Sequence, residues 1–140
     1  MMLDQVTVFL ENDKGRLSAL TRVLSDADIN MYALTIAETS DYGLVRIVCN
    51  KPEAAVEALR AADMRASVIK VVGVAVPNRP GGLAELLKTF EELDLNIEYG
   101  YCFSVAGEEA VDVLKVSDPV RASEALAAAG YRLLDAEDMR

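Results

Sequence analysis

Apolar and polar residues follow two different periods along this chain, one typical of strands and the other of helices. Residues 5–10 alternate, with Val6, Val8 and Leu10 on one side, which is the period of a strand with one buried face. After a polar turn, apolar residues recur every three or four positions as far as Ala27, as in an amphipathic helix. The first part of the chain therefore predicts a strand followed by a helix.

The same reading gives the order strand, helix, strand, strand, helix, strand, which then starts again. The two central strands of each half are expected to form an antiparallel hairpin. Asn50 and Asp118 lie just before prolines and are expected to cap the following helices, and Gly130 suits a left-handed helix end. The expected strands are 5–10, 31–38, 44–49, 64–69, 71–76, 97–105, 111–116 and 131–134, and the expected helices are 16–27, 52–62, 83–93 and 119–129.

A comparison of the two halves shows an internal repeat. Val8 matches Val74 and Asn12 matches Asn78 at a spacing of 66 positions, and the spacing becomes 67 later in the repeat. One extra residue in the second hairpin turn, at 106–109, explains the change. Repeats of this kind indicate a duplicated structural unit. We therefore expect two domains, 1–69 and 70–140.

Each half has the element order of a split βαβ unit. The predicted fold class is α+β, with two ferredoxin-like βαββαβ units whose antiparallel sheets carry helices on one face. The stretches 44–49 and 71–76 are apolar at both parities, which is typical of strands buried on two faces or paired at an edge. We infer that sheet meets sheet, within the chain or between chains; the alternative is that these valines are simply exposed.

Composition narrows the possible functions. A net charge of -9 and the absence of histidine argue against a nucleic-acid partner and against histidine-based catalysis. Cys49 and Cys102 lie in apolar stretches and are expected to be small, buried, reduced thiols, as suits a cytoplasmic protein. No apolar stretch is long enough to cross a membrane, no export signal is expected at the start of the chain, and no metal or cofactor site is indicated.

The turns that follow the first strand of each repeat carry the candidate chemistry. Where a strand passes into a helix through a glycine-containing turn, the first helix amides are unpaired and can hold an anion. Gly81 and Gly82 would let a ligand approach this backbone, but neither turn has the spacing of a phosphate-binding loop. The carboxamides of Asn12 and Asn78 offer donors and an acceptor. This combination suits a zwitterion better than a phosphate.

Two further asparagines, Asn30 and Asn96, lie at the far ends of the same helices. Because a whole helix separates the two asparagines of one unit, a shared ligand would have to lie between neighbouring units. The alternative is that all four are turn residues, since asparagine side chains bond nearby backbone. Their recurrence in both copies does not decide this, because a duplicated fold also duplicates its turns.

The two turn segments, 11–17 and 77–83, resemble the signatures of ACT domains, which are regulatory modules that bind amino acids. Asp-Ile-Asn-Met follows the first segment and Asp-Leu-Asn-Ile the second, so the resemblance covers nearly the whole chain as two copies. It implies ligand binding between adjacent ACT units. The candidate ligand-binding residues are Asn12, Asp13, Gly15 and Asn30 in the first copy and Asn78, Arg79, Gly81, Gly82 and Asn96 in the second.

Two departures from the serine-sensing ACT domain of phosphoglycerate dehydrogenase limit this resemblance. Leu10 and Val76 replace the histidine that precedes the loop asparagine there, so serine specificity does not carry over. Lys14 stands where the motif often has proline, which makes the first turn less rigid.

Three functions follow from these observations. The first is a non-catalytic regulatory protein, expected to be a homodimer, that binds a free amino acid at interfaces between ACT units. The second is a regulatory subunit that docks on a metabolic enzyme, similar to the small subunit of acetolactate synthase. The third, an enzyme on a ferredoxin-like scaffold, is disfavoured because the acidic residues fall mostly on exposed faces; Glu98 and Asp112, inside predicted strands, are expected to face solvent.

Overall fold

The computed structural model describes residues 2–38 and 41–139, which form two units. The amino-terminal unit comprises the described residues of Asp4–Ile69. The carboxy-terminal unit comprises the described residues from Lys70 onward, together with Met2 and Leu3.

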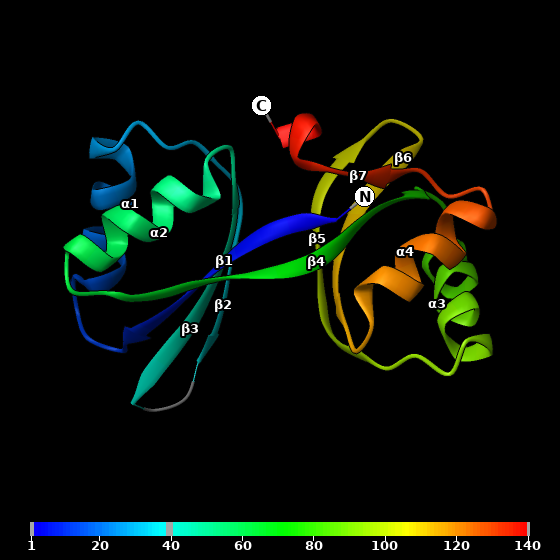
Figure 1. Cartoon of the computed structure of the whole chain (residues 1–140), viewed down its shortest axis with the longest axis horizontal. Coiled ribbons are helices and arrows are strands. Elements are labelled where there is room, and N and C mark those ends of the chain that lie inside the picture. Colours follow the sequence, from blue (N-terminus) through cyan, green and yellow to red (C-terminus); the bar gives the residue numbers. More distant parts are fainter. Residues whose placement is uncertain (1, 39–40, 140) are drawn as a thin grey trace. The chain divides into compact units, whose positions relative to one another are not determined.

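The amino-terminal unit is a four-stranded antiparallel sheet with two helices on one face (Figure 1). Its strands follow the order β2-β3-β1-β4, and Val45 of β3 pairs with Val8 of β1 and with Ile36 of β2. This is the strand order of a ferredoxin-like unit. Its elements are β1 (Leu3–Glu11), α1 (Arg16–Asp26), β2 (Met31–Glu38), β3 (Tyr42–Cys49), α2 (Pro52–Ala61) and the first part of β4 (Arg65–Pro77).

The carboxy-terminal unit repeats this arrangement, with β7 in the place of the fourth strand. The order is β7-β4-β6-β5, and Val74 of β4 pairs with Asp112 of β6 on one side and with Leu133 of β7 on the other. The predicted fold class of two ferredoxin-like units is confirmed. The elements are the remainder of β4, α3 (Gly82–Glu92), β5 (Ile97–Ala106), β6 (Glu109–Val116), α4 (Pro119–Ala128), β7 (Leu133–Leu134) and the 3₁₀ helix η1 (Ala136–Met139).

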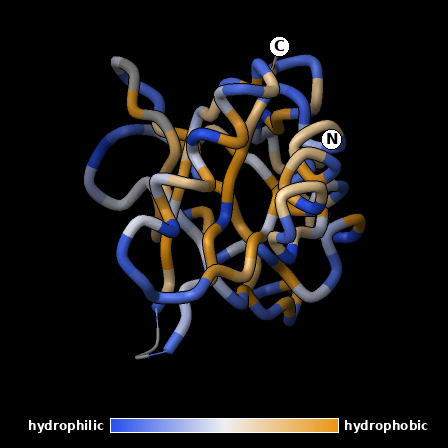
Figure 2. Tube along the Cα trace, turned by 90° about the vertical axis from the view of Figure 1, so that its left-hand side faces the viewer, coloured by the Kyte–Doolittle hydropathy of each residue, from blue (hydrophilic) through white to orange (hydrophobic). Residues whose placement is uncertain are grey.

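Each unit has its own hydrophobic core between its sheet and its helices. The alternating strand pattern and the helical pattern predicted from the sequence both direct their apolar sides into these cores, and Figure 2 shows hydrophobic residues recurring along the elements. Burying one such side chain fully contributes about 1.5–3 kcal/mol. The fully buried members include Val8, Leu20 and Leu59 in the amino-terminal unit and Val74, Leu86 and Leu126 in the carboxy-terminal unit.

Most local predictions hold, but the cap of α2 was wrong. Asp118 caps α4 by accepting a hydrogen bond from the Arg121 amide at 3.1 Å, and Gly130 ends that helix with a φ of 92°. Asn50 does not cap α2. Its Oδ1 instead accepts a hydrogen bond from the Asn30 amide at 3.0 Å. The carboxamide therefore supports the connection that enters β2.

Two residues of the second hairpin also differ from expectation. Cys49 is buried as predicted, but Cys102 is exposed. Asp112 is half-buried rather than open to solvent, and burial raises the pKa of its carboxyl. Glu98 is exposed as predicted and pairs with Lys115 at 2.8 Å.

The apolar stretch 71–76 is buried at every position, so the predicted burial at both parities is confirmed there. Packing of sheet on sheet stays a prediction. None of the helices in residues 2–38 and 41–139 has the length and apolar character needed to span a membrane.

Candidate ligand-binding site

The turn between β4 and α3 is shaped by two adjacent glycines. Gly81 precedes α3 with a φ of 87°, a left-handed conformation that favours glycine. A Cβ atom at Gly82 would lie only 2.2 Å from the Pro77 carbonyl oxygen. Glycine at this position therefore lets the start of α3 approach the end of β4 closely.

The first amide of each helix is paired, which differs from the expectation: the Arg16 amide donates to the Asp13 carbonyl oxygen at 3.2 Å, and the Gly82 amide donates to the Arg79 carbonyl oxygen at 3.0 Å. Gly15 has a φ of 86° at the equivalent position before α1. No side chain of the described residues caps α1 or α3. Because the first amides of a helix carry partial positive charge, both helix starts favour an anionic group.

Asn78 connects the β4–α3 turn to the β5–β6 turn through two hydrogen bonds. Its backbone amide donates to the Glu108 carbonyl oxygen at 2.7 Å, and its Nδ2 donates to the Gly107 carbonyl oxygen at 3.1 Å. The next residue, Arg79, forms an exposed ion pair with Glu85 of α3 at 3.3 Å. The Asn78 side-chain amide thus has a structural role in addition to any contact with a ligand.

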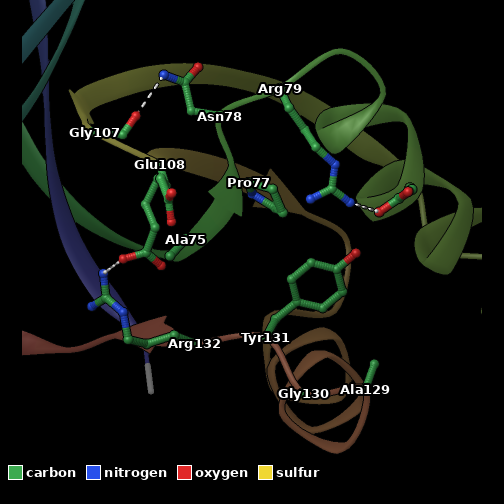
Figure 3. A pocket seen from close by; sticks show the side chains of 12 residues that line it. Ala75, Pro77, Asn78, Arg79, Gly107, Glu108, Ala129, Gly130, Tyr131 and Arg132 are labelled. Atoms are coloured by element: carbon green, nitrogen blue, oxygen red, sulfur yellow. Dashed lines mark hydrogen bonds and ion pairs between the residues drawn. The ribbon is translucent and has the colours of Figure 1, made fainter.

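Asn78 and Arg79 line a groove of about 890 Å³ inside the carboxy-terminal unit (Figure 3). The end of β4, the β5–β6 turn and the connection from α4 to β7 form its walls. Tyr131 extends its ring into the space below Arg79 in this view, and Arg132 lies on the other side of that ring. Arg132 forms an ion pair with Glu109 at 3.4 Å.

The structure places the other predicted residues elsewhere. Asn30 borders a separate cavity of about 380 Å³ at the end of α1, next to Asn50. Asn96 lies at the far end of α3, where its carbonyl oxygen accepts from the Ser117 amide at 3.2 Å. Of the nine candidates, only Asn78 and Arg79 line the large groove; Asn12, Asp13 and Gly15 form the β1–α1 turn, and Gly81 and Gly82 start α3. Ligand binding by these residues stays a prediction.

The sequence analysis did not single out several groove residues, including Glu108, Glu109, Tyr131 and Arg132. These four come from the β5–β6 turn, the start of β6 and the connection between α4 and β7, which lie far from Asn78 in the sequence. One signal was present, because Arg65 and Arg132 occupy equivalent positions at the spacing of 67.

The equivalent surface of the amino-terminal unit has aromatic rings beside the charged residues Arg60, Asp63 and Arg65. Phe9 and Tyr42 stack with their ring centroids 4.4 Å apart and an interplanar angle of 23°. The Arg65 Cζ lies 5.4 Å from the Phe9 ring centroid, within the range of a cation–π contact. The cavity beside these groups measures about 630 Å³.

Comparison with known proteins decides the family. A model of the ACT domain pair matches residues 1–140. The chain belongs to the ACT domain pair family. The ACT resemblance predicted from the two turn segments is therefore confirmed over the whole chain.

Solved structures agree with this ACT pair assignment. Protein BT0572 from Bacteroides thetaiotaomicron is 36% identical, with a TM-score of 0.94 over 99% of this chain and 96% of that one. The aspartate kinase regulatory subunit from Thermus thermophilus is 14% identical, with a TM-score of 0.64 over 91% and 92% of the two chains. The corresponding subunit from Thermus flavus is 17% identical, with a TM-score of 0.63 over 92% of each chain. Among curated proteins, none matches significantly.

In this ACT pair, the described residues bring no three His, Cys, Asp or Glu side chains together as metal ligands. The groove instead combines arginine, glutamate, asparagine and tyrosine. Such groups are suited to holding a small polar molecule by ion pairs and hydrogen bonds.

Proposed function

We propose that this ACT pair is a non-catalytic cytoplasmic regulator that binds a free amino acid. The observation that carries the proposal is the ACT domain pair match over residues 1–140. Binding would act as a signal if the amino acid had different affinities for two arrangements of the protein or its partner.

The glycine-containing turns support a ligand with a carboxylate. Gly15 and Gly81 precede helices that lack a side-chain cap from the described part of the chain. A carboxylate placed at such a helix start is stabilised by typically 0.3–1 kcal/mol. Asn30 and Asn96 would contribute only in an arrangement that brings neighbouring units together, as the family resemblance implied.

The test is a thermal-shift screen of the full chain against the twenty protein amino acids, each tested singly. A ligand at 100 times its dissociation constant stabilises a fold by about 2.7 kcal/mol, and for a chain of this size we expect a rise in Tm of roughly 5–10 °C. Glycine amide and acetate, which each carry one of the two charged groups, are the controls. A cooperatively folded protein that responds to no amino acid would overturn the proposal.

A second candidate function is a regulatory subunit that docks on a catalytic chain. It is favoured by large apolar side chains left open on the sheet-edge strands, with Ile36 of β2 47% exposed and Val105 of β5 61% exposed. Exposed apolar side chains of this size mark interaction sites when they gather into a patch. Copurification of a larger metabolic enzyme with the tagged chain would favour this function, whereas a stable free homodimer would favour the first.

A further inference from the structure

Asp112 places a carboxylate on the helix-covered face of the carboxy-terminal sheet. In the strand pairing it lies opposite Val74, which belongs to the hydrophobic core of this unit. Leu114 and Ala110, two positions to either side of Asp112 on β6, pack into the same core. Because alternate residues of a strand share one face, the Asp112 side chain also lies on the face that α3 and α4 cover (Figure 1).

The same position in the amino-terminal unit is apolar. Val45 is equivalent to Asp112 in the strand pairing, and it is completely buried. Its neighbour on the edge strand β2 is Ile36, whereas the neighbour of Asp112 on the edge strand β5 is Cys102. A valine beside an isoleucine in one copy is therefore a carboxylate beside a thiol in the other.

The Asp112 carboxylate has no partner that offsets its burial. Among residues 2–38 and 41–139, no group forms a hydrogen bond or an ion pair with it, and burial raises the pKa of this carboxyl. Removing a charged group from water without a partner destabilises a fold. A residue that breaks this rule inside an otherwise regular unit is a candidate for a functional role.

The position of Asp112 near the sheet edge makes its carboxylate accessible to a ligand. Asp112 is only half-buried, and its neighbour Cys102 on the edge strand is exposed. β4 ends at Pro77, three residues after Val74, the partner of Asp112. Three residues span about 10 Å along a strand. A group bound near the start of α3 could therefore reach Asp112 only through a long side chain.

We propose that Asp112 selects an amino acid with a long, positively charged side chain for the carboxy-terminal ACT unit. The α-carboxylate lies at the start of α3, and the Asp112 carboxylate pairs with the side-chain ammonium or guanidinium. Leu83 and Leu87, one turn apart on α3 and 48% and 38% exposed, offer apolar surface to the methylene groups of the ligand. The ligand class is a basic α-amino acid.

This inference rests on the proposed function for the binding of an amino acid and adds the chemistry of its side chain. The charged groups on the ligand backbone stay at the glycine-containing turn and at the contact between units that the family resemblance implies. Val45 and Ile36 offer no partner to a cation in the other copy. We therefore expect one basic amino acid to bind per chain.

The test is isothermal titration calorimetry of the full chain with two pairs of ligands. Lysine is compared with norleucine, and arginine with citrulline, because each second member has a similar length and lacks the side-chain charge. Hydrogen bonds between charged groups are the stronger kind. At least one basic amino acid is therefore expected to bind tenfold or more tightly than its neutral counterpart.

A matched pair of variants assigns that preference to one residue. Asp112→Asn keeps the shape of the side chain and removes its charge, so it is expected to weaken binding of the basic amino acid about tenfold or more. Glu92→Gln removes the same charge from an exposed position on α3 and is expected to leave the affinity unchanged.

The stability of the unliganded protein separates ligand binding from a structural role. Asp112→Asn removes a partly buried charge, so its Tm without ligand at neutral pH is expected to equal or exceed that of the wild type. A structural role predicts a lower Tm instead. Should Asp112→Asn fail to fold, Asp112→Val copies Val45 of the first unit, and the same loss of affinity is expected.

The outcomes distinguish this inference from the proposed function. If the wild-type chain binds a neutral amino acid as tightly as the basic ones, the assignment of Asp112 is wrong and the proposed function stands. Unchanged affinity in Asp112→Asn, or an equal loss in Glu92→Gln, would likewise overturn the assignment alone. A folded wild-type chain that binds no amino acid would overturn both.

Discussion

The amino-terminal and carboxy-terminal ACT units share one backbone plan but present different chemistry at the same position. Phe9 and Tyr42 stack in the first unit, whereas Ala75 and Glu109 leave a charged groove in the second. Cores tolerate little change because close packing penalises altered volume. The changed positions lie outside the apolar clusters that form the two cores, with Phe9 of β1 replaced by Ala75 of β4. Duplication has therefore kept the fold and altered the surface that can receive a ligand.

The largest loss of stability is expected from a substitution in the β4–α3 turn. Gly82 has no counterpart in the first copy, where Arg16 starts α1. Gly82→Ala would place a Cβ atom 2.2 Å from the Pro77 carbonyl oxygen and force the backbone apart. We expect a loss of about 2–3 kcal/mol in the free energy of unfolding, measured by urea denaturation.

The left-handed glycines are the matched controls for that turn. Gly15 and Gly81 have φ values of 86° and 87°, and a Cβ atom at either would meet nothing within 4 Å. Gly15→Ala and Gly81→Ala should therefore cost similar amounts, about 1–2 kcal/mol each. If Gly82→Ala costs less than either of them, then the close approach at Pro77 does not constrain the turn.

A smaller effect on stability, which depends on pH, is expected from a residue in the sheet of the carboxy-terminal unit. Asp112 occupies the position that Val45 holds in the first copy, opposite Val74 as Val45 is opposite Val8. Burial raises the pKa of the Asp112 carboxyl above its ordinary value. The folded chain therefore binds the Asp112 proton more strongly than the unfolded chain, and stability falls as the pH rises from the ordinary pKa of aspartate through the raised pKa.

Replacing the carboxyl with an apolar group should remove that penalty. We expect Asp112→Val to stabilise the chain at neutral pH, with the part of the gain that is due to charge disappearing as the pH falls below the ordinary pKa of aspartate. The measurement is the free energy of unfolding of both proteins across this range of pH. A gain that stays constant with pH would show that Asp112 is not desolvated in the folded protein.

The fold was predictable because each element is encoded locally and each is encoded twice. The alternation around Val6 and Val8 and the helical spacing of Leu20 and Leu24 recur in the second copy, and consistent local signals of this kind specify a fold. The exposed Cys102 was misassigned because β5 has apolar residues on both of its faces. Local pattern alone could not decide which face is covered.

The groove was harder to predict because long-range pairing assembles it. Asn78 was singled out for its turn, yet its Nδ2 bonds to Gly107, which is 29 positions away. Arg132 and Glu109 are ordinary surface residues in the sequence, and only the pairing of β4 with β6 and β7 brings them together. A residue can be assigned to a site only when its neighbours in space are known.

The most direct test of amino-acid binding is an amide NMR titration of the full chain with the amino acid that raises Tm most. The account predicts chemical-shift changes concentrated in the two glycine-containing turns, residues 11–17 and 77–83, and around Asn30 and Asn96. Changes confined to residues outside these segments would contradict the account.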